Sequence, residues 1–168
     1  LYTQMGQAMG TLEYMSPEQA EMNELGVDTR TDVYSLGVLF YELLTGSTPL
    51  GHDRVRREAY HRLVELICSE ETPAPSRRLS DSGEGIAGIS AQRQIDPHRL
   101  SGVLKGELDW IALKALSKER DRRYDGAGNL ADDVQHFLDG EVVTARPPTA
   151  GYRLRKSIRR NKTAFVSG

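Results

Sequence analysis

Residues 31–45 read TDVYSLGVLFYELLT, and this stretch decides the fold of the chain. Apolar side chains dominate it and occupy nearly every face of the helix that the pattern predicts. A helix of that kind belongs in the middle of a core. Gly46 follows where a left-handed C-cap is expected. We therefore expect a central helix that Thr31 caps and that runs from Asp32 to about Thr45.

Four further helices are expected around the central one. Residues 16–19 read SPEQ, a capping box with a proline at the first helical position, which predicts the start of a short helix. Amphipathic patterns predict helices over residues 53–70, about 107–116 and about 128–138. Residues 72–106 contain three prolines among glycines and serines, so we expect a long exposed loop there. The expected inward side chains are Val55, Ala59, Leu63, Leu66, Ile67, Leu108, Ile111, Ala112, Ala115, Leu116, Leu130, Val134, Phe137 and Leu138.

These elements make the chain mainly α-helical, built around one buried central helix. Cys68 is the sole cysteine, so no internal disulfide can form, and its apolar surroundings favour a buried structural thiol. The four histidines are His52, His61, His98 and His136; they lack metal-ligand spacing, so surface positions are expected and no metal site is predicted.

Two motifs carry functional information because they occur in order. Residues 10–18 read GTLEYMSPE, and residues 31–37, TDVYSLG, begin 13 positions after Glu18. Each alone has a structural reading, as a helix cap or as a helix-start carboxylate that the helix dipole favours. Together they resemble the end of the protein-kinase activation segment and the buried helix that follows it, with Ser16-Pro17-Glu18 in place of the A-P-E signature. Residues 120–124, RDRRY, resemble the late arginine element of the same family.

The resemblance covers about residues 1–140 and implies the helical C-lobe of the protein-kinase fold, which is α+β when intact. The motif is typical of bacterial transmembrane serine/threonine kinases. It implies that Gly10 and Thr11 help to position the substrate hydroxyl, which favours a serine/threonine kinase over a tyrosine kinase. It also implies a buried ion pair between Glu18 and Arg123 that ties the activation segment to the lobe, with Arg122 as the alternative partner.

The resemblance implies roles for two further residues. Asp32 would accept hydrogen bonds from the backbone of the catalytic loop, since a lone carboxylate in the middle of a core is very costly. Thr3 lies where related kinases often carry an activating phosphothreonine, and a phosphate there could order the loop through an arginine. A solvated loop threonine is the alternative interpretation of Thr3.

The groups that bind ATP and transfer phosphate are absent from the 168 residues. There is no glycine-rich phosphate loop, V-A-I-K-like lysine, H-R-D aspartate or D-F-G magnesium ligand. His52-Asp53-Arg54 has similar letters but opens a different helix after the central one. We therefore expect a partial kinase domain with no catalytic residue of its own. The intact kinase would use ATP and Mg²⁺, and this chain alone should bind neither.

The net charge of −2 conceals an asymmetry between the tail and the body of the chain. The first 150 residues hold 16 basic and 24 acidic side chains, whereas residues 151–168 have six basic side chains and no acidic one. Such segments flank the cytoplasmic ends of membrane-spanning helices, so we expect a juxtamembrane segment on anionic lipid and a spanning helix beyond residue 168. A solvated tail is one alternative; a nucleic-acid patch is another, but no nucleic acid is expected because stacking aromatics are missing. The basic side chains are Arg153, Arg155, Lys156, Arg159, Arg160 and Lys162.

Residues 1–140 are thus expected to form part of a kinase domain, and residues 141–168 a linker and basic segment. The first functional hypothesis is a serine/threonine protein kinase. This part of the kinase would supply the platform for a protein substrate. The second is a catalytically dead, kinase-like scaffold, against which the retained Thr11 argues. The third, a membrane-surface protein that acts through its tail alone, is disfavoured by the kinase motifs.

Overall fold

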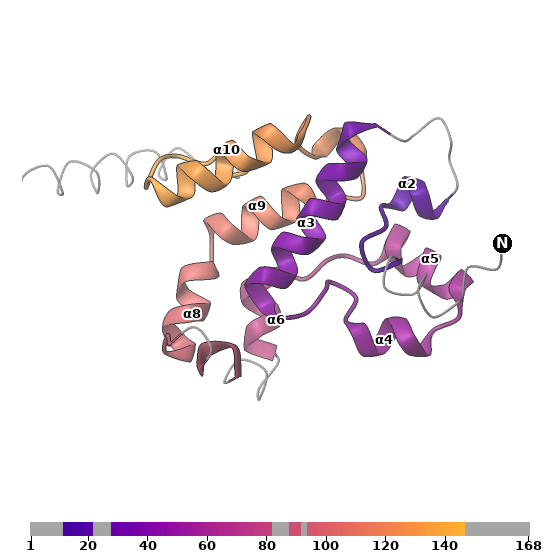
Figure 1. The fold of residues 1–168 in the computed structure, drawn as a ribbon, viewed down its shortest axis with the longest axis horizontal. Helices are drawn as coiled ribbons and strands as arrows, with labels where there is room; N and C mark the ends of the chain where they lie inside the picture. Colours follow the sequence, from indigo (N-terminus) through magenta and orange to yellow (C-terminus); the bar gives the residue numbers. More distant parts are fainter. Residues whose placement is uncertain (1–11, 22–27, 82–87, 92–93, 147–168) are drawn as a thin grey trace, which may run out of the picture.

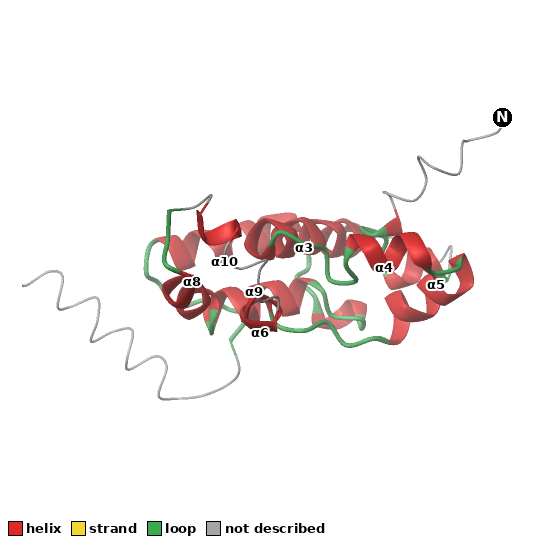
Figure 2. Cartoon of the chain, turned by 90° about the horizontal axis from the view of Figure 1, so that it is seen from below, coloured by secondary structure: helices red, strands yellow, loops and turns green. Residues whose placement is uncertain are grey.

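The structure is a computed structural model of the chain, and it describes residues 12–21, 28–81, 88–91 and 94–146. Within these ranges all the regular elements are helices, as Figure 2 shows, which confirms the mainly α-helical fold class. In chain order the main ones are α2 (Pro17–Ala20), α3 (Thr29–Thr45), α4 (His52–Arg57), α5 (Tyr60–Ser69), α6 (Pro75–Asp81), α8 (Pro97–Leu104), α9 (Glu107–Ala115), the 3₁₀ turn η2 (Arg120–Arg122) and α10 (Ala127–Leu138).

The central helix α3 crosses the middle of the molecule, with α9 and α10 on one side and α2, α4 and α5 toward the other end (Figure 1). Three clusters of buried side chains surround it, and the ring of Phe40 packs against all three. The first lies between α3, α9 and α10, the second lies between α3 and α9, and the third joins α6, α8 and α9. The core is therefore organised around α3, as the sequence predicts.

The start of α3 differs from the prediction. The helix begins at Thr29, and its N-cap is Asp28, whose carboxylate accepts the Arg30 backbone N–H at 2.8 Å. Thr31 is the third helical residue, and its hydroxyl accepts the backbone N–H of Asp28 at 3.4 Å. The C-terminal end agrees with the expectation, because Gly46 has φ 74° and donates its N–H to the carbonyl of Glu42.

One face of α3 is not covered by the described part of the chain. Leu36, Leu39 and Leu43 are 39%, 44% and 62% exposed, and Asp32 is exposed on the same helical face. We call these four residues the α3 stripe. The expectation of burial all round is therefore wrong for this chain, because the described helices pack only against the other faces of α3.

Two predicted spans have a different structure. Residues 53–70 form two helices, because the extended backbone of Glu58 and Ala59 separates α4 from α5. The loop predicted over residues 72–106 instead contains α6 and α8. Leu79, Leu100 and Leu104 from these helices are buried, so this region contributes to the core.

Several individual predictions on burial are also corrected. Ala59 is exposed, and Leu138 is 68% exposed at the end of α10. The Cys68 thiol is half-buried, with its sulfur 3.8 Å from the carbonyl of Pro17, and burial raises its pKa. His61 is exposed as expected, but His52 lies between two carboxylates described below.

Residues 141–146 turn back after α10 and pack against the first cluster, and we call them the strap. Val143 is fully buried there beside Val33 and Leu130. Ala145 packs against the same cluster. The folded body therefore continues past residue 140 and through residue 146.

Gly37 is a point of close approach between α3 and α9, and it generates a prediction. A Cβ there would lie 2.8 Å from the Cβ of Ala115, which is fully buried and cannot move aside. Gly37→Ala should lower the free energy of unfolding by about 1–3 kcal/mol in urea titrations, because it overpacks this contact. The matched control is Gly128→Ala on α10, where a Cβ meets nothing within 4 Å. The control should change stability by less than about 1 kcal/mol and in the stabilising direction; equal losses for both variants would contradict the prediction.

Candidate functional site

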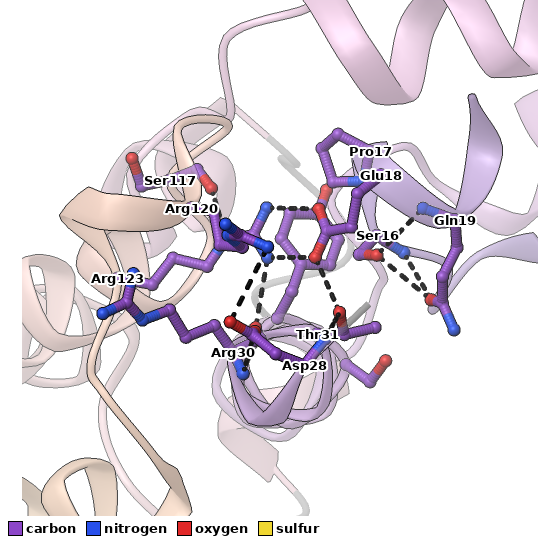
Figure 3. A network of polar contacts seen from close by, with 12 residues as sticks. Ser16, Pro17, Glu18, Gln19, Asp28, Arg30, Thr31, Ser117, Arg120 and Arg123 are labelled. Atoms are coloured by element: carbon purple, nitrogen blue, oxygen red, sulfur yellow. Dashed lines mark hydrogen bonds and ion pairs between the residues drawn. The ribbon is translucent and has the colours of Figure 1, made fainter. Parts of the chain in front are cut away.

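The short helix α2 fixes the direction of Glu18. The hydroxyl of Ser16 accepts the backbone N–H of Gln19 at 3.4 Å, and the side chain of Gln19 accepts the backbone N–H of Ser16 at 3.1 Å. Pro17 occupies the first helical position, where its missing N–H costs nothing. This capping box, visible in Figure 3, is the one predicted from the sequence. It points Glu18 toward the interior.

Glu18 forms a buried, two-pronged ion pair with Arg123 (Figure 3). The distances are 2.7 Å from Nη1 to Oε1 and 2.8 Å from Nη2 to Oε2. The hydroxyl of Thr31 donates a further hydrogen bond of 2.9 Å to Oε1. The two charged residues are 9% and 4% exposed, so water screens the pair little. We call Glu18, Thr31 and Arg123 the anchor.

Arg123 uses all five of its N–H groups. Besides Glu18, they reach the carbonyls of Ser117 at 2.7 Å, Arg30 at 3.1 Å and Lys118 at 3.2 Å. The guanidinium also lies over the ring of Tyr34, 5.0 Å from its centroid. The anchor therefore joins α2, the first turn of α3 and the segment that follows α9. A lysine could not make these contacts, because it lacks the planar fork of donors.

The anchor holds Glu18 in its ionised form. Burial alone would raise the pKa of this carboxyl, but the hydrogen bonds from Arg123 and Thr31 and the charge of Arg123 lower it to about 2. Glu18 is therefore negatively charged at neutral pH, as the ion pair requires.

The segment before α2 is attached to α3 by a second set of contacts. The hydroxyl of Ser35 donates to the carbonyl of Tyr14 at 2.8 Å. The hydroxyl of Tyr14 donates to the carboxylate of Glu42, and this hydrogen bond raises the pKa of Tyr14 to about 12. Residues 12–15 thus lie along α3, directly after the Gly10-Thr11 pair.

Glu13 adds contacts to the loop and helix that follow α3. Its Oε2 lies 2.6 Å from His52 Nδ1 and accepts the hydroxyl of Thr48 at 2.9 Å. The other nitrogen of His52 is 3.3 Å from a Glu42 carboxylate oxygen. No local sequence pattern predicts this cluster, because its members lie far apart along the chain.

The structure confirms some of the predictions about site residues and leaves others as predictions. The pairing of Glu18 with Arg123 is confirmed, and Arg122 instead contacts Glu119 on the surface at 2.6 Å. Asp32 is exposed, so its predicted role toward a catalytic loop stays a prediction. The remaining predicted residues lie outside the described part of the chain; they are Thr3, Gly10, Thr11, Arg153, Arg155, Lys156, Arg159, Arg160 and Lys162.

The chemistry of the described donors does not fit a bound metal. In residues 12–146, apart from the gaps given above, no three His, Cys, Asp or Glu side chains are grouped so that they could hold an ion. No step through Mg²⁺ is therefore assigned to the residues in these ranges. Within the same ranges, no helix has both the length and the apolar composition needed to cross a bilayer.

Comparison with known proteins agrees with this geometry. The protein kinase domain family matches residues 2–127, which include α2, the anchor and the central helix, and the chain belongs to this family. The fold and the anchor thus define the helical lobe of a protein kinase.

Among the relatives, the serine/threonine-protein kinase PknB of Mycolicibacterium smegmatis is 35% identical over 143 residues, covering 85% of this chain and 18% of that protein. PknB of Mycobacterium tuberculosis is 32% identical over 166 residues, covering 99% of this chain and 21% of that protein. PknB of Mycobacterium leprae is 34% identical over 148 residues, with coverages of 88% and 18%. The chain spans about a fifth of the length of the curated relatives that it matches.

Removal of the Arg123 side chain should lower the stability of the chain far more than removal of the neighbouring Arg122 side chain. Arg123→Ala leaves the Glu18 carboxylate buried without its partner, which should lower the free energy of unfolding by about 3–5 kcal/mol. The matched control is Arg122→Ala, which removes only a surface pair and should cost less than about 1 kcal/mol. Urea unfolding followed by circular dichroism would measure both. Similar losses for the two variants would show that the anchor contributes no more than a surface contact.

The anchor also predicts how stability depends on pH. The pKa of Glu18 is about 2 in the folded chain against an ordinary value of 4.5, so the stabilisation is complete above about pH 4.5 and declines as the pH falls toward 2. The difference corresponds to on the order of 3 kcal/mol. Unfolding of the wild-type chain and of Glu18→Gln should be compared at pH 7, 4.5 and 3. The variant should have the lower free energy of unfolding at pH 7, and the difference between the two chains should become smaller as the pH falls. A difference that stays constant from pH 7 to pH 3 would contradict the lowered pKa of Glu18.

Proposed function

We propose that this chain is the substrate-facing helical part of a serine/threonine protein kinase, which transfers the γ-phosphate of ATP to serine or threonine side chains of proteins. In that reaction the substrate hydroxyl oxygen bonds to the γ-phosphorus, the bond from that phosphorus to the bridging oxygen of ADP breaks, and ADP leaves. The hydroxyl proton would pass to a base that lies outside these 168 residues. The groups that bind Mg-ATP would come from outside these 168 residues. The role of this part is to hold the segment that carries Thr11 against the lobe.

The observation that carries this proposal is the buried Glu18–Arg123 pair at the base of that segment. Glu18 is only seven positions after Thr11, and residues 12–15 between them are attached to α3 through Ser35 and Glu42. The segment is therefore attached on both sides of Met15. A rigid attachment of this kind is what the positioning of a substrate hydroxyl needs, since small displacements cost large factors in rate.

The α3 stripe supports the idea that further chain packs on this lobe. Three large apolar side chains in a row along one helix face are a typical docking surface rather than a typical solvent face. Asp32 lies at the end of this row nearest the start of α3. We assign the stripe as the surface on which the catalytic-loop part of the kinase domain docks. Asp32 would accept hydrogen bonds from the backbone N–H groups of that loop.

The proposal can be tested on the gene product that includes the residues upstream of Leu1. With a D-F-G motif within about 25 residues upstream and an H-R-D motif before it, that protein should phosphorylate a generic protein substrate. Thr11→Ala should reduce kcat on the order of 10–100-fold, because the substrate hydroxyl is displaced. Thr11→Ser, which keeps the hydroxyl, is the matched control and should retain most activity.

Calorimetry with Mg-ATP separates the kinase proposal from the scaffold alternative. The longer protein should bind Mg-ATP, and the 168-residue chain should not. A longer protein that is folded but neither binds Mg-ATP nor transfers phosphate would favour a kinase-like scaffold. Binding of Mg-ATP to the 168-residue chain would contradict the assigned division of roles.

For the basic tail we propose a position at the cytoplasmic face of a membrane, next to a spanning helix beyond residue 168. The support is the charge of residues 151–168, where six basic side chains occur without an acidic one. The chain should then bind vesicles that contain phosphatidylserine, and the binding should weaken with salt. A variant with the six basic residues replaced by glutamine should lose it; unchanged binding would remove the support for this position.

A further inference from the structure

One buried carboxylate holds the strap against the body of the lobe. Asp133 on α10 is fully buried, and its Oδ1 accepts the backbone N–H of Thr144 at 2.6 Å. Its Oδ2 accepts the N–H of Ala145 at 2.8 Å and the hydroxyl of Thr144 at 2.9 Å. Without the strap the buried Asp133 carboxylate would lose three of the four hydrogen-bond donors that contact it, which is costly. The strap and Asp133 therefore stabilise each other.

The same carboxylate also holds Tyr124. The hydroxyl of Tyr124 donates to Asp133 Oδ2 at 2.8 Å, and its buried ring belongs to the cluster that contains Val143 of the strap. Burial alone would raise the pKa of Asp133, but the hydrogen bonds from Thr144, Tyr124 and Ala145 lower it below its ordinary value. Tyr124 thus contacts the strap both through Asp133 and through apolar packing.

Tyr124 directly follows the arginine of the anchor. The backbone of Arg123 is extended, with φ −73° and ψ −179°, and consecutive side chains of extended backbone point to opposite sides. Arg123 accordingly reaches Glu18 on α2, while Tyr124 reaches Asp133 on α10. Two consecutive residues are therefore held between two buried carboxylates, one on α2 and one on α10.

We propose that the strap and the anchor are thermodynamically coupled through Arg123 and Tyr124, so that release of the strap loosens the attachment of α2. The two states are a docked strap with a tight anchor and a released strap with a loosened one. The strap directly precedes residues 147–168, so a ligand bound to that segment, or tension on it, would change the attachment of the segment that carries Thr11. The coupling involves only residues of this chain, so its test does not depend on the proposed kinase activity.

Hydrogen exchange on the 168-residue chain tests the coupling. Asp133→Asn replaces one of the two carboxylate oxygens that together accept from four donors with an NH2 group, which accepts none of them. The amides of Thr144 and Ala145 should then exchange at least about five-fold faster, as expected for the loss of one net hydrogen bond. The α2 amides of Ala20 and Glu21, which donate to the carbonyls of Ser16 and Pro17, should accelerate as well. Amides in the middle of α3 and α9 should keep their rates.

Two further variants make the test specific. Asp132→Asn is the matched control, since Asp132 is the exposed neighbour on α10 and the chemical change is the same; it should alter neither region. Val143→Ala weakens the packing of the strap in the cluster that also contains the Tyr124 ring, and it removes no hydrogen bond of Asp133 and no contact of α2. It therefore gives a second readout of the coupling where Asp133→Asn fails to fold. Coupling is reciprocal, so Glu18→Gln should in turn accelerate exchange at Thr144 and Ala145.

The outcomes that overturn the proposal are distinct. Faster exchange in the strap with unchanged rates at Ala20 and Glu21, in both Asp133→Asn and Val143→Ala, would show that the strap and the anchor are independent. Unchanged exchange rates at Thr144 and Ala145 in Asp133→Asn would show that this carboxylate does not hold the strap. A uniform increase that includes α3 and α9 would mean loss of global stability instead of a specific connection.

Discussion

The guanidinium of Arg123 connects parts of the chain that are otherwise far apart in sequence. It binds the Glu18 carboxylate through two hydrogen bonds and caps the backbone carbonyls of Arg30, Ser117 and Lys118 with its other donors. The position of α2 depends on this group, because α2 is a single turn that could not stay folded by its own propensity. α5 packs against α2, so the placement of that helix is linked to the same interaction. A buried side chain whose donors are all satisfied is rigid, and that rigidity suits the substrate platform that we propose.

Local patterns predicted the parts of the fold that local physics controls. The apolar run of α3, the left-handed Gly46 and the capping box at Ser16 are each encoded within a few residues, and the structure confirms them. The prediction of a loop over residues 72–106 is wrong because proline marks the start of a helix as well as irregular chain. Pro75 and Pro97 instead stand at the first positions of α6 and α8, where proline is well suited. The break at Glu58 and Ala59 has neither glycine nor proline, so nothing local marks it.

In the candidate site, too, some contacts could be predicted from the sequence and others could not. The Glu18–Arg123 pair was predictable because the family resemblance places both residues, although they are 105 positions apart. The cluster of Glu13, Glu42 and His52 was not, since it depends on how the chain crosses itself after α3. Asp133 did leave a signal, because an acidic residue stands among the inward positions of α10 beside Leu130, Val134 and Phe137. An acid on an apolar helix face needs donors, and the strap supplies them.

The position of Val143 has a consequence for how this lobe is made on the ribosome. Its side chain fills the same cluster as Val33, which is synthesised 110 residues earlier, and as Ile111 and Leu130. The emerging chain can form α3 and pack α9 against it, but the cluster stays open on one side until the strap has left the exit tunnel. During that interval apolar surface of the nascent lobe is accessible to chaperones and to neighbouring chains. A truncation before residue 143 would make this transient state permanent.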